Sequence, residues 1–249
     1  MIELESVQPF AQKWLAYWPE QNILTNFVPS LQQPMVLAWA CLLFELHECA
    51  FALEHEPVRE QKSLWWSQEL HSMSEHTAHH PLTQALQYLP VMFSELAQPV
   101  LQLAQQTPIR ASNTQDLFLR LQPLSGVIAQ LEQQLFGGVE STHQAITAQL
   151  LLMRLPHGVD AFDQAMIPMH LLARHQSLEQ IRNEQALLRD WLTEIAAMIP
   201  AQHSGNGIRE VQTRFTQRRL KQLQSQKSPH IQFGHAWDAW RAMRIHPSV

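Results

Sequence analysis

Histidine is the residue type in this 249-residue sequence whose frequency most suggests chemistry, since fourteen copies are present. Imidazole nitrogens bind Zn²⁺ and other transition metals, but the ligands must recur at spacings that let them converge on one ion. The sequence contains no CxxC or HExxH pattern. Four histidines gather near the end of one predicted helix and in the loop after it, where we favour a solvated loop over a metal site: His71, His76, His79 and His80.

The two cysteines offer no clearer site. Cys41 and Cys49 share an apolar segment with His47, and His55 follows on the same predicted helix. Positions two apart on a helix point to different sides, so these four residues cannot ligate one ion together. We therefore predict that both cysteines belong to the core and that the protein occupies a reducing compartment. No GxSxG elbow, phosphate-binding P-loop or dinucleotide-binding GxGxxG fingerprint occurs.

The composition predicts that these residues are carried by helices. Only seven glycines are present, on which β-turns and phosphate-binding loops depend, whereas fifteen prolines can separate helices. We predict an all-α fold, a single domain over residues 1–249 with about eight to ten helices around a central cavity. A short helix with Trp14 and Trp18 comes first. The longer helices are expected at 35–56, 60–75, 83–106 with a bend, 115–136 with an interruption near Pro123, 140–155, 178–198 and 207–224.

Charge and hydropathy exclude several function classes. A net charge of −5 with 16% charged residues argues against a broad nucleic-acid surface, which needs clustered Lys and Arg. An apolar content of 45% excludes a disordered chain. The longest apolar run, Met35–Phe44, is about half of the roughly 20 residues that a membrane-spanning helix needs. Because the acidic start, Met1–Glu5, lacks the features of a signal peptide, we predict a cytoplasmic protein.

Short motifs follow one another along most of the chain. Two long segments contain the majority of them, and a stretch rich in Trp and Arg lies near the end. The motifs are Leu42–Glu48, the EP step at Glu56–Pro57, the pair Trp65 and Trp66 followed by Glu69, the HP step at His80–Pro81, Gln149–His157, Ile167–Pro168, Leu171–His175 with the sequence LLARH, and His235–Arg244.

In their order and spacing these motifs resemble the squalene and phytoene synthase family, over about residues 25–245. The resemblance implies an all-α transferase that joins two prenyl diphosphates head to head. In active members of the family, two Asp-rich motifs on facing helices hold Mg²⁺ ions that bind the diphosphate leaving groups. The chemistry requires these ions because a departing diphosphate develops several negative charges, which carboxylate-bound Mg²⁺ stabilises.

The chain departs from the family pattern at both motifs. At the first, the acids are Glu45 and Glu48, which share a helical face and are weak candidates for catalytic residues or metal ligands. At the second, Asp160 and Asp163 have suitable mutual spacing but a shifted register, and Pro156 disfavours a regular helix there. The alternative, which we favour, is that all four acids are solvated surface groups.

We therefore predict a degenerate family member that has lost Mg²⁺-dependent catalysis and acts as an isoprenoid-binding or assembly protein without a cofactor. One divergent branch that the sequence resembles includes factors for assembly of respiratory complex I, which makes another protein a candidate partner. A bound isoprenoid or prenyl diphosphate would place its tail among Leu42, Leu46 and Phe51 and its head at Arg154. Two alternatives stay open: an active Mg²⁺-dependent prenyl transferase, and a helical interaction protein whose cavity is filled by large apolar side chains.

Basic and aromatic residues supply the remaining candidates. Arg154, Arg174 and Arg182 are candidate diphosphate contacts, because a guanidinium pairs with phosphate oxygens in bidentate fashion. Trp65 and Trp66 lie about 100° apart on a helix, so we expect one in the core and the other at an edge. A basic patch on a late helix is a candidate for anionic lipid head groups or an acidic partner, against the alternative of a solvated face: Arg209, Arg214, Arg218, Arg219 and Lys221.

Overall fold

Helices are the only regular elements in the part of the chain that the computed structural model describes, namely residues 4–53, 55–106, 109–153, 166–175, 183–201, 205–225 and 230–245. The predicted all-α fold is thereby confirmed. In chain order the α-helices are α1 (Leu4–Tyr17), α2 (Gln21–Thr25), α3 (Gln33–His47), α4 (Glu56–Ser74), α5 (Pro81–Leu86), α6 (Ala97–Gln106), α7 (Thr114–Phe136), α8 (His143–Leu152), α10 (Met169–His175), α11 (Asn183–Met198), α12 (Gly207–Gln224) and α13 (Phe233–Ile245).

The apolar segment predicted as one helix over 35–56 divides into two elements. The α-helical part, α3, ends at His47, and a π-helical turn follows over Glu48–Ala52. Pro57 lies in the first turn of α4 and so begins the next helix instead of ending this one. Proline is tolerated there because the backbone N–H groups of the first turn have no acceptor within the helix, so the N–H that proline lacks is not needed. The predicted boundary was therefore wrong by several residues.

Side-chain caps and glycine set the ends of the two helices that the sequence placed best. Asn113 accepts the N–H of Asp116 at 2.8 Å where α7 begins, and Gly137, at a φ of 71°, ends it. Asn206 caps α12 in the same way by accepting the N–H of Arg209 at 2.9 Å. The interruption predicted near Pro123 was wrong, because α7 continues through it and its packing against α8 and α6 outweighs one lost hydrogen bond.

The segment expected as one bent helix over 83–106 is three separate elements: α5, a 3₁₀ turn at Phe93–Leu96, and α6. A carboxylate from α4 holds the start of α5. Glu69 Oε1 accepts the N–H groups of His79 and His80 at 2.7 Å each and the hydroxyl of Thr83. A tertiary contact therefore satisfies the backbone donors that a continuous helix would have used internally.

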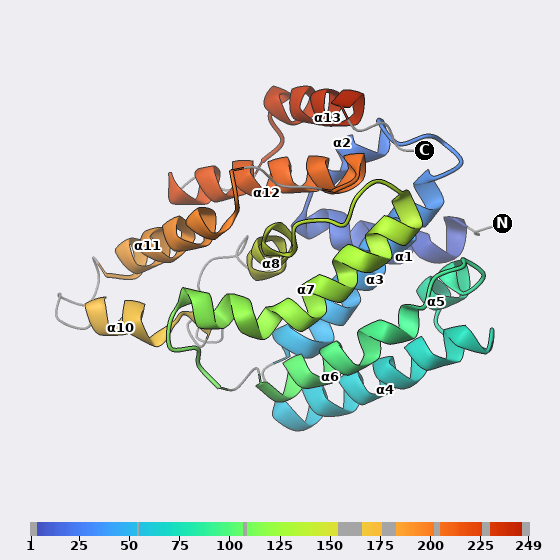
Figure 1. Cartoon of the computed structure of the whole chain (residues 1–249), viewed down its shortest axis with the longest axis horizontal. Helices are drawn as coiled ribbons and strands as arrows, with labels where there is room; N and C mark the ends of the chain where they lie inside the picture. The colour runs from blue at the N-terminus through green and yellow to red at the C-terminus, as the bar shows by residue number, and fades with distance from the viewer. Residues whose placement is uncertain are drawn as a thin grey trace.

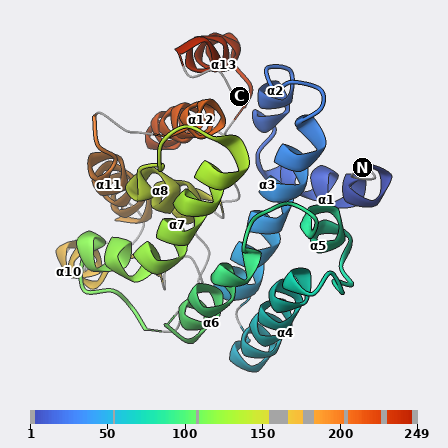
Figure 2. The same cartoon turned by 45° about the vertical axis from the view of Figure 1, so that its right-hand side comes forward.

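The helices form two groups on either side of α3 and α7, as Figure 1 and Figure 2 show. On one side α4 packs against α6 and α5, and α1 and α5 pack against α3. On the other side α12 lies against α8, α11 and α13, and α7 packs on α8. The central helices thus position the ends of α3 and α8, where the sequence places its candidate sites.

Large side chains fill the core between these helices. The fully buried aromatic residues include Trp39 and Phe44 of α3, Phe93 of the 3₁₀ turn, Trp191 of α11, and Trp18 between α1 and α2. Cys41 and Cys49 are buried free thiols, as predicted, and burial raises the pKa of each to about 12. Both are therefore protonated, unreactive core residues.

The predicted basic patch on α12 is not a positive surface. Arg219 is fully buried, and its guanidinium pairs with both oxygens of Glu20 at 2.8 Å and stacks on the Trp18 ring at 3.8 Å from its centroid. Arg209 is equally buried. Arg214 and Arg218 pair with Glu210 and Asp238, which leaves Lys221 as the exposed member of the predicted set.

One stretch of the described helices, Gln33–Phe51, is long and apolar enough to cross a membrane by length and composition alone. Within the fold, 72% of an 18-residue window of this stretch is buried. The core helix of a soluble protein meets the same criteria, so this stretch is weak evidence for a membrane span.

Replacing Arg219 with Gln should lower the free energy of unfolding by about 3–5 kcal/mol, because the Glu20 carboxylate then stays buried without its partner. The matched control is Arg174→Gln, an exposed arginine whose nearest carboxylate oxygen lies at 3.6 Å. That control should cost less than about 1 kcal/mol. Urea unfolding followed by circular dichroism measures both, and equal losses would contradict the assigned role of the buried pair.

Glu69 predicts a specific acid dependence of stability. Burial favours its neutral form, but the hydrogen bonds from His80, Thr83 and His79 outweigh burial and lower its pKa below the usual 4.5. The stabilisation is therefore complete above pH 4.5 and lost as pH falls through the folded-state pKa. Unfolding from pH 7 to pH 2.5 should show wild type losing its advantage over Glu69→Gln, whereas the exposed Glu60→Gln should track wild type throughout.

Candidate functional site

The two acids of the first predicted motif converge on one lysine. Glu45 lies in the last turn of α3 and Glu48 begins the π-helical turn after it. Lys13 of α1 places its Nζ 2.8 Å from Glu45 Oε1, and the same nitrogen donates to Glu48 Oε2. The Phe44 ring lies beneath this ammonium, 5.5 Å from Nζ to the ring centroid. The predicted shared face of Glu45 and Glu48 is confirmed, and a protein cation lies between the two carboxylates.

The electrostatics of this cluster favour the charged lysine. Partial burial lowers the pKa of Lys13, but its hydrogen bonds and its attraction to Glu45 and Glu48 outweigh burial and raise that pKa above 10.5. The ammonium therefore stays protonated at neutral pH. A hard divalent cation would compete with this ammonium for Glu45 Oε1 and Glu48 Oε2, the carboxylate oxygens that Lys13 contacts. The arrangement is a partly exposed ion-pair triad in which one ammonium contacts one oxygen of each carboxylate.

Sequence spacing alone did not find Lys13. It precedes Glu45 by 32 residues, on a different helix, and no local motif surrounds it. The only indication in the sequence is that Lys13 is adjacent to Trp14 on the first predicted helix. We expect a helix of this kind to pack against the core through its tryptophans. Only the docking of α1 against α3 brings the charges together.

The second motif is only partly described. Arg154, Asp160, Asp163 and Arg182 lie outside the described residues. Arg174 is exposed and faces acids of α11. It therefore has carboxylate neighbours of its own in the described structure.

Around that position α10 and α11 form a polar contact. His170 Nε2 lies 2.9 Å from Glu194 Oε2, and His175 Nε2 lies 3.0 Å from Asp190 Oδ2. Thr114 Oγ1 donates to the same Glu194 carboxylate from the start of α7. Within the described ranges, no three His, Cys, Asp or Glu side chains are grouped so that they could hold a metal ion.

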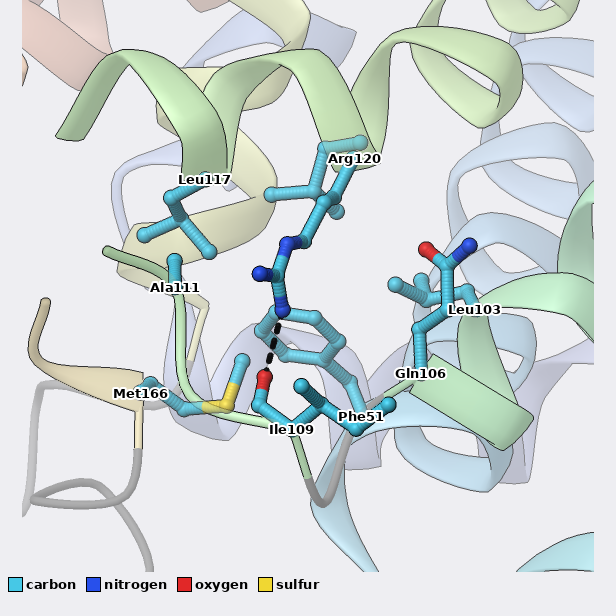
Figure 3. A pocket seen from close by; sticks show the side chains of 9 residues that line it. Phe51, Leu103, Gln106, Ile109, Ala111, Leu117, Arg120 and Met166 are labelled. Carbon is cyan, nitrogen blue, oxygen red and sulfur yellow. Dashed lines mark hydrogen bonds between the residues drawn. The ribbon is translucent and has the colours of Figure 1, made fainter. Parts of the chain in front are cut away.

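A small cavity lies between the π-helical turn after α3 and the helices α6 and α7 (Figure 3). Phe51, one of the predicted ligand contacts, lines it together with Met166 and Arg120. Its volume is about 20 Å³, close to the space that one water molecule needs. The other two predicted contacts, Leu42 and Leu46, are buried in the core and do not line it.

The one charged group at this cavity already has partners. The Arg120 guanidinium donates to Asp116 at 2.9 and 3.1 Å and to the carbonyl oxygen of Ile109 at 2.6 Å, the bond drawn in Figure 3. Asp116 accepts in addition from Ser112. These contacts, with Arg120 foremost, lower the pKa of the Asp116 carboxyl. Arg120 therefore stabilises the loop before α7 and is already occupied by protein groups.

A broader depression follows the outer side of α7. This depression is shallow and open to solvent, with a volume of about 460 Å³. Its lining combines apolar and polar residues: Leu119, Gln122, Pro123, Gly126, Val127, Gln130, Glu140 and His143. The space beside Gly126 is open, since nothing lies within 4 Å of the Cβ that another residue would add there.

The WW pair and His80 pack within the fold, whereas His71, His76 and His79 are exposed, as the prediction of a solvated segment expects. Trp66 is buried, whereas Trp65 is 44% exposed, which confirms the predicted division between core and edge. His80 packs between Phe10 and Trp66, with ring centroids 4.8 Å from each, and burial lowers its pKa. His76 stacks on Tyr88.

No family model, no curated protein and no solved structure matches the chain. The site must therefore be interpreted from its own residues, and the resemblance to squalene and phytoene synthases stays a prediction.

Removing the Lys13 charge should make the first motif responsive to metal. In Lys13→Met the repulsion between Glu45 and Glu48 is unrelieved, so millimolar Mn²⁺ should raise the melting temperature of the variant but not of wild type. The stability loss without metal should stay below about 1 kcal/mol, because the cluster is partly exposed. Lys62→Met, which removes an exposed lysine of α4, is the control and should show no Mn²⁺ response. A rise in the melting temperature of wild type with Mn²⁺ would contradict the view that Lys13 occupies this motif in place of a metal ion.

Proposed function

We propose that this chain is a squalene/phytoene synthase-like protein without Mg²⁺-dependent catalysis, and that it acts as an assembly or interaction protein. The observation that carries the proposal is the Lys13 ammonium between Glu45 and Glu48. In a prenyl transferase of this type, the carboxylates at that motif would bind Mg²⁺.

Charge balance supports the loss of catalysis. The departing diphosphate of an allylic substrate needs several divalent cations, and these need carboxylates on two facing helices. Here Lys13 already compensates one of the two negative charges of the first motif. A single ammonium on a helix surface cannot replace a cluster of metal ions that stay partly bound to phosphate and water.

Packing supports interaction over small-molecule binding. A farnesyl tail of fifteen carbons needs many times the roughly 20 Å³ present beside Phe51. Two of the three residues expected to line a tail site, Leu42 and Leu46, are covered by other core side chains. Large aromatic side chains fill the core between the described helices. This is the feature that we expect of a helical protein that binds partners through its surface.

An isoprenoid-binding function without catalysis is the second candidate. It is favoured by one observation, the position of Phe51 of the π-helical turn at the cavity beside α6 and α7. Ligand binding there would require the residues that now close the cavity to move apart.

Calorimetry with farnesyl diphosphate, with and without Mg²⁺, separates these functions. The proposal expects no binding, and product analysis of the same sample, repeated with geranylgeranyl diphosphate, should find no coupled product. Binding that is independent of Mg²⁺ would favour the isoprenoid-binding candidate. Mg²⁺-dependent binding with product formation, lost in Glu45→Ala and Glu48→Ala and retained in Glu60→Ala, would overturn the proposal and make both acids catalytic ligands.

A further inference from the structure

The last described helix, α13, is amphipathic with its aromatic side turned outward. Phe233, Trp237 and Trp240 are 88%, 54% and 42% exposed, and Arg241 and Arg244 are exposed beside them. We call these five residues the α13 ridge. They are the exposed side chains of α13 up to residue 244.

Helical geometry places the ridge on one side. At 100° per residue, positions 233, 237, 240, 241 and 244 fall within an arc of about 100°. The buried positions of the same helix lie opposite and hold His235, Ala239 and Ala242. A helix of a soluble fold normally buries its large apolar side chains. Here His235 and two alanines face the protein, whereas one phenyl and two indole rings face outward.

The position of α13 leaves this side uncovered. It forms the outer edge of the described fold and packs inward on α12 and α2 (Figure 1 and Figure 2). Beside Gly234 lies the guanidinium of Arg218, the flexible end of an α12 side chain that a Cβ there would displace. The contacts of α13 with α12 and α2 are made from its buried side, opposite to the exposed aromatic residues.

The charge on the ridge has one sign. Arg244 lies over Trp240, 5.2 Å from the ring centroid, and among the described residues no carboxylate pairs with Arg244 or Arg241. The acid of this helix, Asp238, lies on the flank of the ridge, three residues before Arg241, and is paired with Arg218. The ridge therefore combines indole and phenyl rings with free guanidinium groups and has no acid of its own.

We propose that the α13 ridge binds a membrane surface rich in anionic phospholipid. Tryptophan is enriched at the level of lipid head groups, where its ring is buried and its N–H stays near water. Helices lying in that plane combine such rings with basic residues. Guanidinium groups pair with lipid phosphate oxygens, which gives preference for anionic over zwitterionic lipid. This inference is independent of the proposed function.

The shape and charge of the ridge favour a membrane over a protein partner. A lipid surface can close around a convex helix, whereas aromatic and arginine side chains at protein interfaces lie in matching pockets within a polar rim. A second copy of the chain would bring two sets of Arg241 and Arg244 together without a carboxylate between them, which is unfavourable. A uniformly anionic surface has neither problem.

Flotation with liposomes tests the proposal on the full chain. Wild type should bind vesicles of phosphatidylcholine and phosphatidylglycerol at 3:1 and should bind pure phosphatidylcholine far more weakly. Raising NaCl from 0.05 to 0.5 M should reduce binding, because lipid attraction of this kind is screened. The triple variant Phe233→Ser, Trp237→Ser and Trp240→Ser should bind at least about 10-fold more weakly.

The basic residues are tested separately. Arg241→Gln with Arg244→Gln should bind about 10- to 30-fold more weakly to the anionic vesicles and should reduce the salt dependence. The controls are Tyr88→Ser and Lys62→Gln, which remove an exposed aromatic and an exposed basic residue elsewhere. Both should bind like wild type. Because every changed side chain is exposed, circular dichroism melting should show all variants folded.

Three results would overturn the proposal. These are no binding to anionic vesicles, binding that both α13 variants retain, and equal binding to pure phosphatidylcholine. A concentration-dependent dimer in sedimentation velocity that the triple variant abolishes, with no vesicle binding, would assign the ridge to a second copy instead.

Discussion

The ion pair between Arg209 and Glu132 is the interaction on which the packing of the central helices depends. Arg209 Nε donates to Glu132 Oε2 at 2.7 Å, its Nη2 bonds the other oxygen, and its Nη1 bonds Gln149. Trp39 Nε1 donates to the same Glu132 carboxylate at 3.2 Å. One buried charge pair therefore connects α12, α7, α8 and α3.

Burial of this pair explains why the helices meet in one arrangement. Removing two charges from water costs several kcal/mol per ion, and only a full set of partners offsets it. Any other register of α12 against α7 would leave Arg209 or Glu132 buried alone, since each is only about 2% exposed. A shift of the helices would leave a buried charge without its partner, which lowers the free energy of unfolding by about 3–5 kcal/mol. The same logic holds for Arg219 and Glu20, which fix α12 to the segment before α2.

Charge compensation within the protein also defines the candidate site. Lys13, Glu45 and Glu48 repeat on a partly exposed surface what Arg209 and Glu132 do in the core. Carboxylates that an enzyme of the resembled family would keep for metal are here satisfied by a side chain. The outward α13 ridge has no such internal partner, which is why it is the place where we expect an external one.

The sequence by itself determined the features that depend on neighbours within about four residues. Helical class, the start and end of α7, and the extent of α12 follow from glycine scarcity, the Asn113 cap and Gly137. The division between Trp65 and Trp66 follows from helical periodicity. The tertiary structure alone decided the partners of charged residues: Lys13 at Glu45, and Arg209 and Arg219 in the core instead of on a basic face. Those pairings join residues 32 to 199 positions apart, and no local preference specifies which distant charge a docked helix will bring. The sequence pattern of α12 is the same whether its arginines face water or buried carboxylates. The distant acids Glu132 and Glu20, which the fold brings to Arg209 and Arg219, make burial of these arginines possible.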